Sequence, residues 1–75
     1  MTLDQWLTEQ KINSEEFGRR IGSTGEAVRK WRAGERMPEP EMVETIRIAT
    51  KDSVTVSDLH LARLSALRTK GVAAA

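Results

Sequence analysis

The sequence predicts an all-α protein in which five helices form a single domain. Signals for helix starts recur five times along the 75 residues, and two glycines follow apolar residues where helices commonly end. Signals for β-structure are almost missing, because the only β-branched alternation, Val54-Thr55-Val56, is too short to carry a sheet. A chain of this length makes one domain. The expected helices span residues 2–11, 14–21, 24–33, 40–50 and 56–69.

The first two helices each begin at a capping box, in which a short polar residue is followed three positions later by Glu or Gln. Thr2 with Gln5 fits this pattern, and so does Asn13 with Glu16. The second helix is expected to end at Gly22, because glycine readily adopts the left-handed conformation that closes a helix.

The remaining three helices carry start signals of different kinds. The third begins at Ser23, which forms a capping box with Glu26, or at its rival cap Thr24. The fourth begins at Pro40, where the missing N–H costs nothing. A further capping box, Thr55 with Asp58, opens the fifth helix.

Composition excludes several functional classes. Without cysteine, the chain has no disulfide, thiolate zinc site or cysteine nucleophile. The only histidine, His60, has no second ligand at metal spacing, so we expect no metal and no other cofactor. Carboxylates are spread over helix surfaces and no Gly-rich phosphate loop is present, so we expect no enzymatic activity. No secretory signal is recognisable and no apolar run approaches the ~20 residues of a membrane span, so we expect a cytoplasmic protein.

The second and third helices carry the most informative pattern. Only two or three residues separate them, which is typical of a helix-turn-helix. This geometry requires a small residue where the helices approach each other and a residue with positive φ in the turn; Gly18 and Gly22 meet these requirements. Both helices must bury apolar residues, and the expected ones are Phe17, Ile21, Val28 and Trp31.

Two stretches resemble the helix-turn-helix of the Cro/repressor (XRE-type) family: INSEEFGRRIG at 12–22 and VRKWRAG at 28–34. The likeness covers residues 3–61 and includes a proline-containing loop and the entry VTVSDL to the fifth helix. It implies a five-helix, lambda-repressor-like domain that binds double-stranded DNA as a homodimer. A protein of this kind is a small bacterial or phage transcriptional regulator, most simply a repressor, located at the nucleoid and needing no small-molecule ligand.

The resemblance places the third helix in the major groove and its first turns against base edges. The implied base contacts are Gly25, Glu26, Arg29 and Lys30. Arg29 can bond guanine O6 and N7 together, and Lys30 reaches either a base or a phosphate. Glu26 either accepts a bond from cytosine N4 or completes a capping box, and Gly25 only permits close approach.

The resemblance also implies contacts to the phosphate backbone. Ser14 lies at the start of the second helix, where free N–H groups favour an anion, although most relatives carry the longer glutamine there. Thr24, at the start of the third helix, is a second candidate. Arg36 in the following loop and Arg32 complete the set.

The fifth helix continues beyond the point where such domains usually close their core. Leu59 and Leu61 are expected to complete the core, which leaves Leu64 and Leu67 for another contact. Either they form the interface of a homodimer or they fold back on the first helix of the same chain. We expect the domain to comprise residues 1–70, with a flexible tail at 71–75.

Net charge is only +1, but its distribution is uneven. Residues 19–36 contain six basic and two acidic residues, whereas residues 1–18 contain one basic and four acidic. The positive segment covers the third helix, which favours a nucleic-acid partner. The alternative is a protein-interaction module, or an antitoxin-type partner protein, that keeps the fold without reading DNA. The operator, the regulated genes and any effector do not follow from the sequence.

Overall fold

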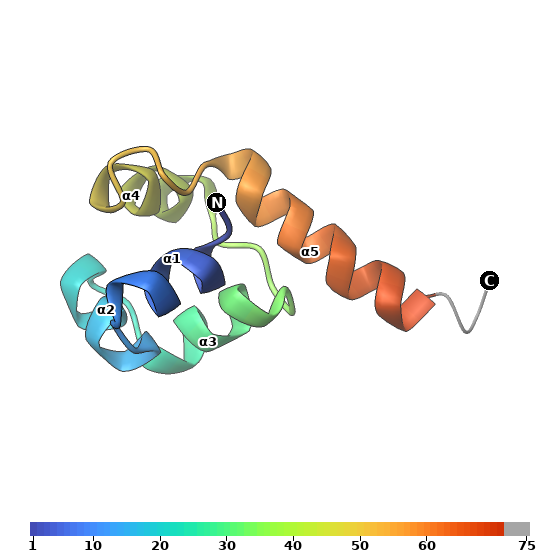
Figure 1. Cartoon of the computed structure of the whole chain (residues 1–75), viewed down its shortest axis with the longest axis horizontal. Coiled ribbons are helices and arrows are strands. Elements are labelled where there is room, and N and C mark those ends of the chain that lie inside the picture. The colour runs from blue at the N-terminus through green and yellow to red at the C-terminus, as the bar shows by residue number, and fades with distance from the viewer. Residues whose placement is uncertain (72–75) are drawn as a thin grey trace.

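The computed structural model describes the backbone of residues 1–71 and the side chains of residues 1–68. Five helices and no strands occur in this range, which confirms the all-α prediction (Figure 1). The helices are α1 (Leu3–Gln10), α2 (Ser14–Ile21), α3 (Gly25–Ala33), α4 (Pro40–Ala49) and α5 (Val56–Gly71). Because α5 extends to Gly71, the helix includes the first residue of the expected tail, and the rest of the tail lies outside the described residues.

Local capping explains where the first two helices begin. The Thr2 hydroxyl accepts a hydrogen bond from the Gln5 N–H at 3.2 Å while the Gln5 side chain accepts one from the Thr2 N–H, so the predicted capping box is complete. The Asn13 side chain accepts from the Glu16 N–H at 2.8 Å, but the Glu16 carboxylate bonds Arg19 and Arg20, so only half of this predicted capping box forms. The bonds accepted by Thr2 and Asn13 satisfy backbone donors that a helix start otherwise leaves free.

Of the two rival caps of α3, Thr24 is the one used. Its hydroxyl accepts from the Ala27 N–H at 3.1 Å. The capping box of Ser23 with Glu26 is therefore wrong, because the helix starts one residue later and the Glu26 side chain bonds Arg29 instead. Pro40 opens α4 as predicted, and Thr55 with Asp58 forms the capping box before α5.

The core contains one cluster of buried apolar side chains, to which every helix contributes. Its members are Leu3, Leu7, Phe17, Val28, Trp31, Ile46, Val54 and Leu59. Ile21 packs against the cluster from the end of α2. The expectation that Leu61 closes the core is wrong, because this side chain is 59% exposed on the outer side of α5.

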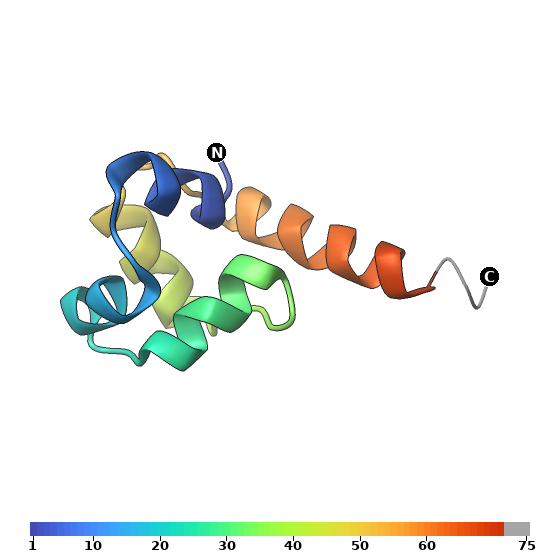
Figure 2. The same ribbon diagram turned by 60° about the horizontal axis from the view of Figure 1, so that its bottom comes forward.

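Close backbone contacts hold α3 between α2 and α5. A Cβ on Gly18 would lie 2.8 Å from the Thr24 carbonyl carbon, so α2 and the start of α3 can approach this closely only because residue 18 is glycine. At the other end of α3, Gly34 adopts φ 75° and lies directly against Ala62 and Ala66 of α5. In Figure 2, α5 then runs on beyond the other four helices.

Candidate nucleic-acid interface

The first turns of α2 and α3 lie against each other, and this contact shapes the candidate site. A Cβ on Gly25 would lie 3.0 Å from the Glu15 Cα, so the backbones of the two helix starts approach closely. Gly22, with φ 75° and open space around it, turns the chain between them. In the protein itself, Gly25 is therefore required for the close packing of α3 against α2, a role that the sequence analysis did not predict.

Arg29 projects from α3 and is held by two carboxylates. Its Nη2 and Nε donate to the two carboxylate oxygens of Glu26 at 2.6 and 3.5 Å, and its Nη1 donates to Glu35 at 3.3 Å. The hydrogen bond and charge of Arg29 hold the pKa of Glu26 below its ordinary value, and the same hydrogen bond raises the pKa of Arg29. Arg29 nevertheless remains 53% exposed, so it can still be reached from outside.

Arg32, on the same helix, connects α3 to α1 and α2. Its Nε donates to the Asp4 carboxylate at 2.8 Å, and its Nη1 donates to the Ser14 hydroxyl at 3.1 Å. The side chain is only 22% exposed. Arg32 therefore orients the Ser14 hydroxyl in the first turn of α2, and the Arg32 side chain is less available to an external anion than that of Arg29.

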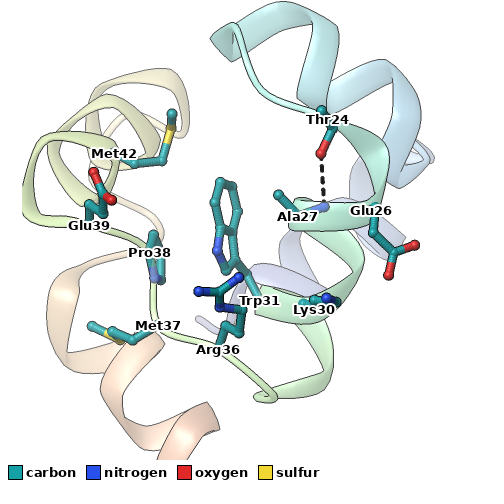
Figure 3. A pocket seen from close by; sticks show the side chains of 10 residues that line it. All are labelled: Thr24, Glu26, Ala27, Lys30, Trp31, Arg36, Met37, Pro38, Glu39 and Met42. Atoms are coloured by element: carbon teal, nitrogen blue, oxygen red, sulfur yellow. Dashed lines mark hydrogen bonds between the residues drawn. The ribbon is translucent and has the colours of Figure 1, made fainter.

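A groove of about 360 Å³ runs between α3, the loop that follows it and the start of α4 (Figure 3). Its polar lining comprises Thr24, the cations Lys30 and Arg36, and the carboxylates Glu26 and Glu39. The ring of Trp31 points from α3 toward Met42 and is 8% exposed, which fits the expected role in the core. Within the part of the chain that the structure describes, the side chains of Lys30 and Arg36 have no ion-pair or hydrogen-bond partner. Both cations are therefore available to an anion.

All eight residues predicted to contact DNA lie along α3 and the helix starts beside it. Besides the groove, two smaller hollows line this surface, one containing Ser14, Arg29 and Arg32 and the other containing Ser14, Gly25, Glu26 and Arg29. The groove shares Glu26 with one of these hollows, and the two hollows share Ser14 and Arg29, so the three adjoin one another around α3. The residues lie close together within a single chain, without DNA or a second subunit.

Leu64 and Leu67 lie elsewhere, on the part of α5 that extends beyond the body of the protein. They are 37% and 45% exposed, and Leu61 precedes them one turn earlier at 59%. The opposite side of α5 carries Ala62 and Ala66, which face Gly34. In the alternative arrangement, these two leucines pack against α1 of the same chain. The structure of the described residues does not have this arrangement, because both side chains stay exposed.

Sequence reasoning missed two ion-pair partners of the candidate residues, Glu35 and Asp4. Glu35 follows the glycine that ends α3, and its contact with Arg29 spans six residues around the helix end. Helical spacing gives no signal for such a pair, because residues six apart do not face each other on a continuous helix. Asp4 meets Arg32 across 28 residues of sequence, which only the packing of α1 against α3 brings about.

Other kinds of site have little support within the described residues. No group of three or more His, Asp or Glu side chains there could hold a metal ion. Across the same residues, no helix has both the length and the apolar character required to cross a membrane. Comparisons with protein-family models, curated proteins and solved structures return no match for this chain.

Proposed function

We propose that this protein binds double-stranded DNA in a sequence-specific manner and regulates transcription, with α2 and α3 acting as a helix-turn-helix. The observation that carries the proposal is that the base-contact and phosphate-contact candidates line three adjoining hollows around α3. Residues 19–36, which include α3, have a net charge of +4. The excess of basic residues in this segment and the exposure of Arg29 suit the major groove, which is wide enough to admit one helix.

Base recognition is assigned to the exposed side of α3, and Arg29 has the central role. A guanidinium has five N–H donors, and the contacts with Glu26 and Glu35 use three of them. One N–H on each terminal nitrogen remains, which matches the two acceptors O6 and N7 of guanine. Glu26 lies beside Arg29 and is assigned to a neighbouring base pair, and Lys30 is assigned to a base or a phosphate.

Phosphate binding is assigned to the residues at the edges of this surface. Lys30 and Arg36 have no protein partner and can neutralise phosphates on one side of α3, where Thr24 also lies. Ser14 lies in the first turn of α2, where backbone N–H groups and the helix dipole favour an anion. Arg32 contributes by fixing Ser14, and we assign it this supporting part in phosphate binding.

We further propose that the protein binds DNA as a homodimer through α5. Leu61, Leu64 and Leu67 form an exposed apolar strip on a helix whose other side already packs against Gly34. A second copy is the simplest partner for a strip of this kind, because twofold contact buries the same residues on both chains. A dimer also pairs two copies of α3 with the two halves of a palindromic site.

The test of base recognition is the substitution Arg29→Ala on a duplex selected from random sequence. A DNA reader loses roughly 1–3 kcal/mol and its preference at one base pair of each half-site. Arg19→Ala is the matched control, because Arg19 also pairs with a glutamate three residues earlier but lies on α2. If Arg29→Ala binds the selected duplex as tightly and as selectively as the unmodified protein, α3 does not read bases through Arg29.

A further inference from the structure

Glu35 is an exposed acidic residue beside the proposed DNA surface, where a negative charge opposes binding. It lies directly after Gly34, and the positive φ of this glycine turns the chain back along α3. The turn brings the Glu35 carboxylate to 3.3 Å from Nη1 of Arg29. The contact with Arg29 offers a reason for an acidic residue at this position.

The two carboxylates hold the guanidinium from different sides. Glu26 takes the edge formed by Nε and Nη2, and Glu35 takes Nη1. Without Glu35, Arg29 keeps only the contact within its own helix, so the guanidinium regains freedom to swing about that edge. With both contacts, one N–H on each terminal nitrogen stays free, which is the number of donors that guanine O6 and N7 require.

Charge gives a second effect of the same arrangement. Arg29 between two glutamates forms a cluster of net charge −1, so the cluster as a whole does not attract phosphates. An arginine released from such a cluster binds the phosphate backbone of any sequence, because phosphate contacts carry no sequence information. Lys30 and Arg36, which lack ion pairs within residues 1–68, are left to supply the non-specific attraction.

We propose that Glu35 is a specificity-determining residue that positions Arg29 for guanine and keeps it from phosphates. This inference rests on the proposed function, because it requires that the protein reads DNA. Glu35 does not touch the base; it acts through the orientation and the charge balance of Arg29.

The experiment compares Glu35→Gln with the unmodified protein on a selected duplex and on a scrambled duplex of the same length. The measured quantity is the ratio of the two dissociation constants. We expect this ratio to fall about three- to tenfold, on the order of the entropy cost of immobilising one long side chain. Glu9→Gln is the control, because it removes one negative charge from the exposed side of α1 and should leave the ratio unchanged.

A double-mutant cycle separates positioning from a change in charge. In an Arg29→Ala background, Glu35→Gln should leave the ratio unaltered, because the side chain that Glu35 positions is gone. An equal fall of the ratio in both backgrounds overturns the proposal. So does an unchanged ratio for Glu35→Gln in a protein that does select a sequence, whereas absence of any sequence selection by the unmodified protein overturns the proposed function itself.

A measurement without DNA keeps the inference testable if the variant binds poorly for other reasons. In the free protein, exchange of the Arg29 guanidinium protons with water, followed by NMR, should be faster in Glu35→Gln than in the unmodified protein. The Arg19 protons serve as the internal reference, since their partner Glu16 is unchanged. Equal exchange of the Arg29 protons in the two proteins contradicts the claim that Glu35 holds this side chain.

Discussion

Gly34 offers a direct test of how α3 is fixed against α5, and Gly22 provides a matched control. Both glycines have φ 75°, so an alanine at either place meets the same backbone strain. Their surroundings differ. A Cβ on Gly22 has nothing within 4 Å, whereas a Cβ on Gly34 would lie 2.9 Å from the Ala66 Cβ and closer still to the Ala62 carbonyl oxygen.

The expected magnitudes follow from these surroundings. Gly22→Ala should cost about 1–2 kcal/mol, the strain of a left-handed conformation. Gly34→Ala adds the cost of forcing α3 and α5 apart, about 1–3 kcal/mol for overpacking. The effect of alanine on the unfolded chain is common to both variants and cancels in their difference. Against the roughly 3–5 kcal/mol available to a domain of this size, Gly34→Ala uses most of the stability.

Thermal unfolding followed by circular dichroism measures the difference. Each kcal/mol lowers the midpoint of so small a domain by roughly 4–8 °C, so Gly34→Ala should unfold well below Gly22→Ala. If Gly34→Ala is unfolded throughout, a stabilising osmolyte restores a measurable transition for both variants. Equal midpoints for the two variants would refute the close approach of α5 to the end of α3.

Two further predictions concern α5. The double substitution Leu64→Glu and Leu67→Glu should convert a dimer to a monomer in sedimentation. The control Ile48→Glu, at an exposed apolar residue of similar size on α4, should leave the dimer intact. A monomer before mutation refutes the interface. Burial opposes ionisation of Asp58, but hydrogen bonds from the Thr55 N–H, the N-terminal ammonium of Met1 and the Thr55 hydroxyl outweigh it and hold the Asp58 pKa below its ordinary value. The stability that Asp58 contributes is therefore present above pH about 4 and is lost as the pH falls through the lower pKa of the folded state. Urea unfolding at a series of pH values should show that Asp58→Asn loses less stability on acidification than the unmodified protein. An identical loss of stability in the two proteins contradicts this.

The helices could be predicted from sequence because their ends are fixed locally. Thr2 with Gln5 and Thr55 with Asp58 form their capping boxes within four residues, so no tertiary information is needed to place them. The choice between Ser23 and Thr24 was less certain from sequence. Both residues can cap α3, and the contact of Gly18 with Thr24 accompanies the later start.

Burial along α5 was harder to predict, because α5 carries apolar residues on more than one side. Leu59 and Leu61 both continue the apolar pattern, but only Leu59 points into the core. The direction is set where Gly34 meets Ala62 and Ala66, a contact between segments far apart in the sequence. Periodicity within one helix cannot supply that direction.

In the candidate site, too, some features could be predicted from the sequence and others could not. The resemblance supplied the candidate contact residues, and they line adjoining hollows around α3 because they come from the helix-turn-helix segment and the loop after it. The ion pairs among them depend on longer-range geometry, since Glu35 reaches Arg29 around a helix end and Asp4 reaches Arg32 from another helix. For this reason Arg29 and Arg32, two arginines on one helix, have different surroundings that the sequence did not distinguish.

Selection of bound duplexes from random double-stranded DNA, followed by a salt titration of the enriched sequence, tests the central claim most directly. The account predicts an enriched palindromic site with a guanine in each half, and an affinity that falls steeply with salt, with a slope of about −0.9 for each phosphate neutralised. No enriched sequence together with no salt-dependent binding would contradict it.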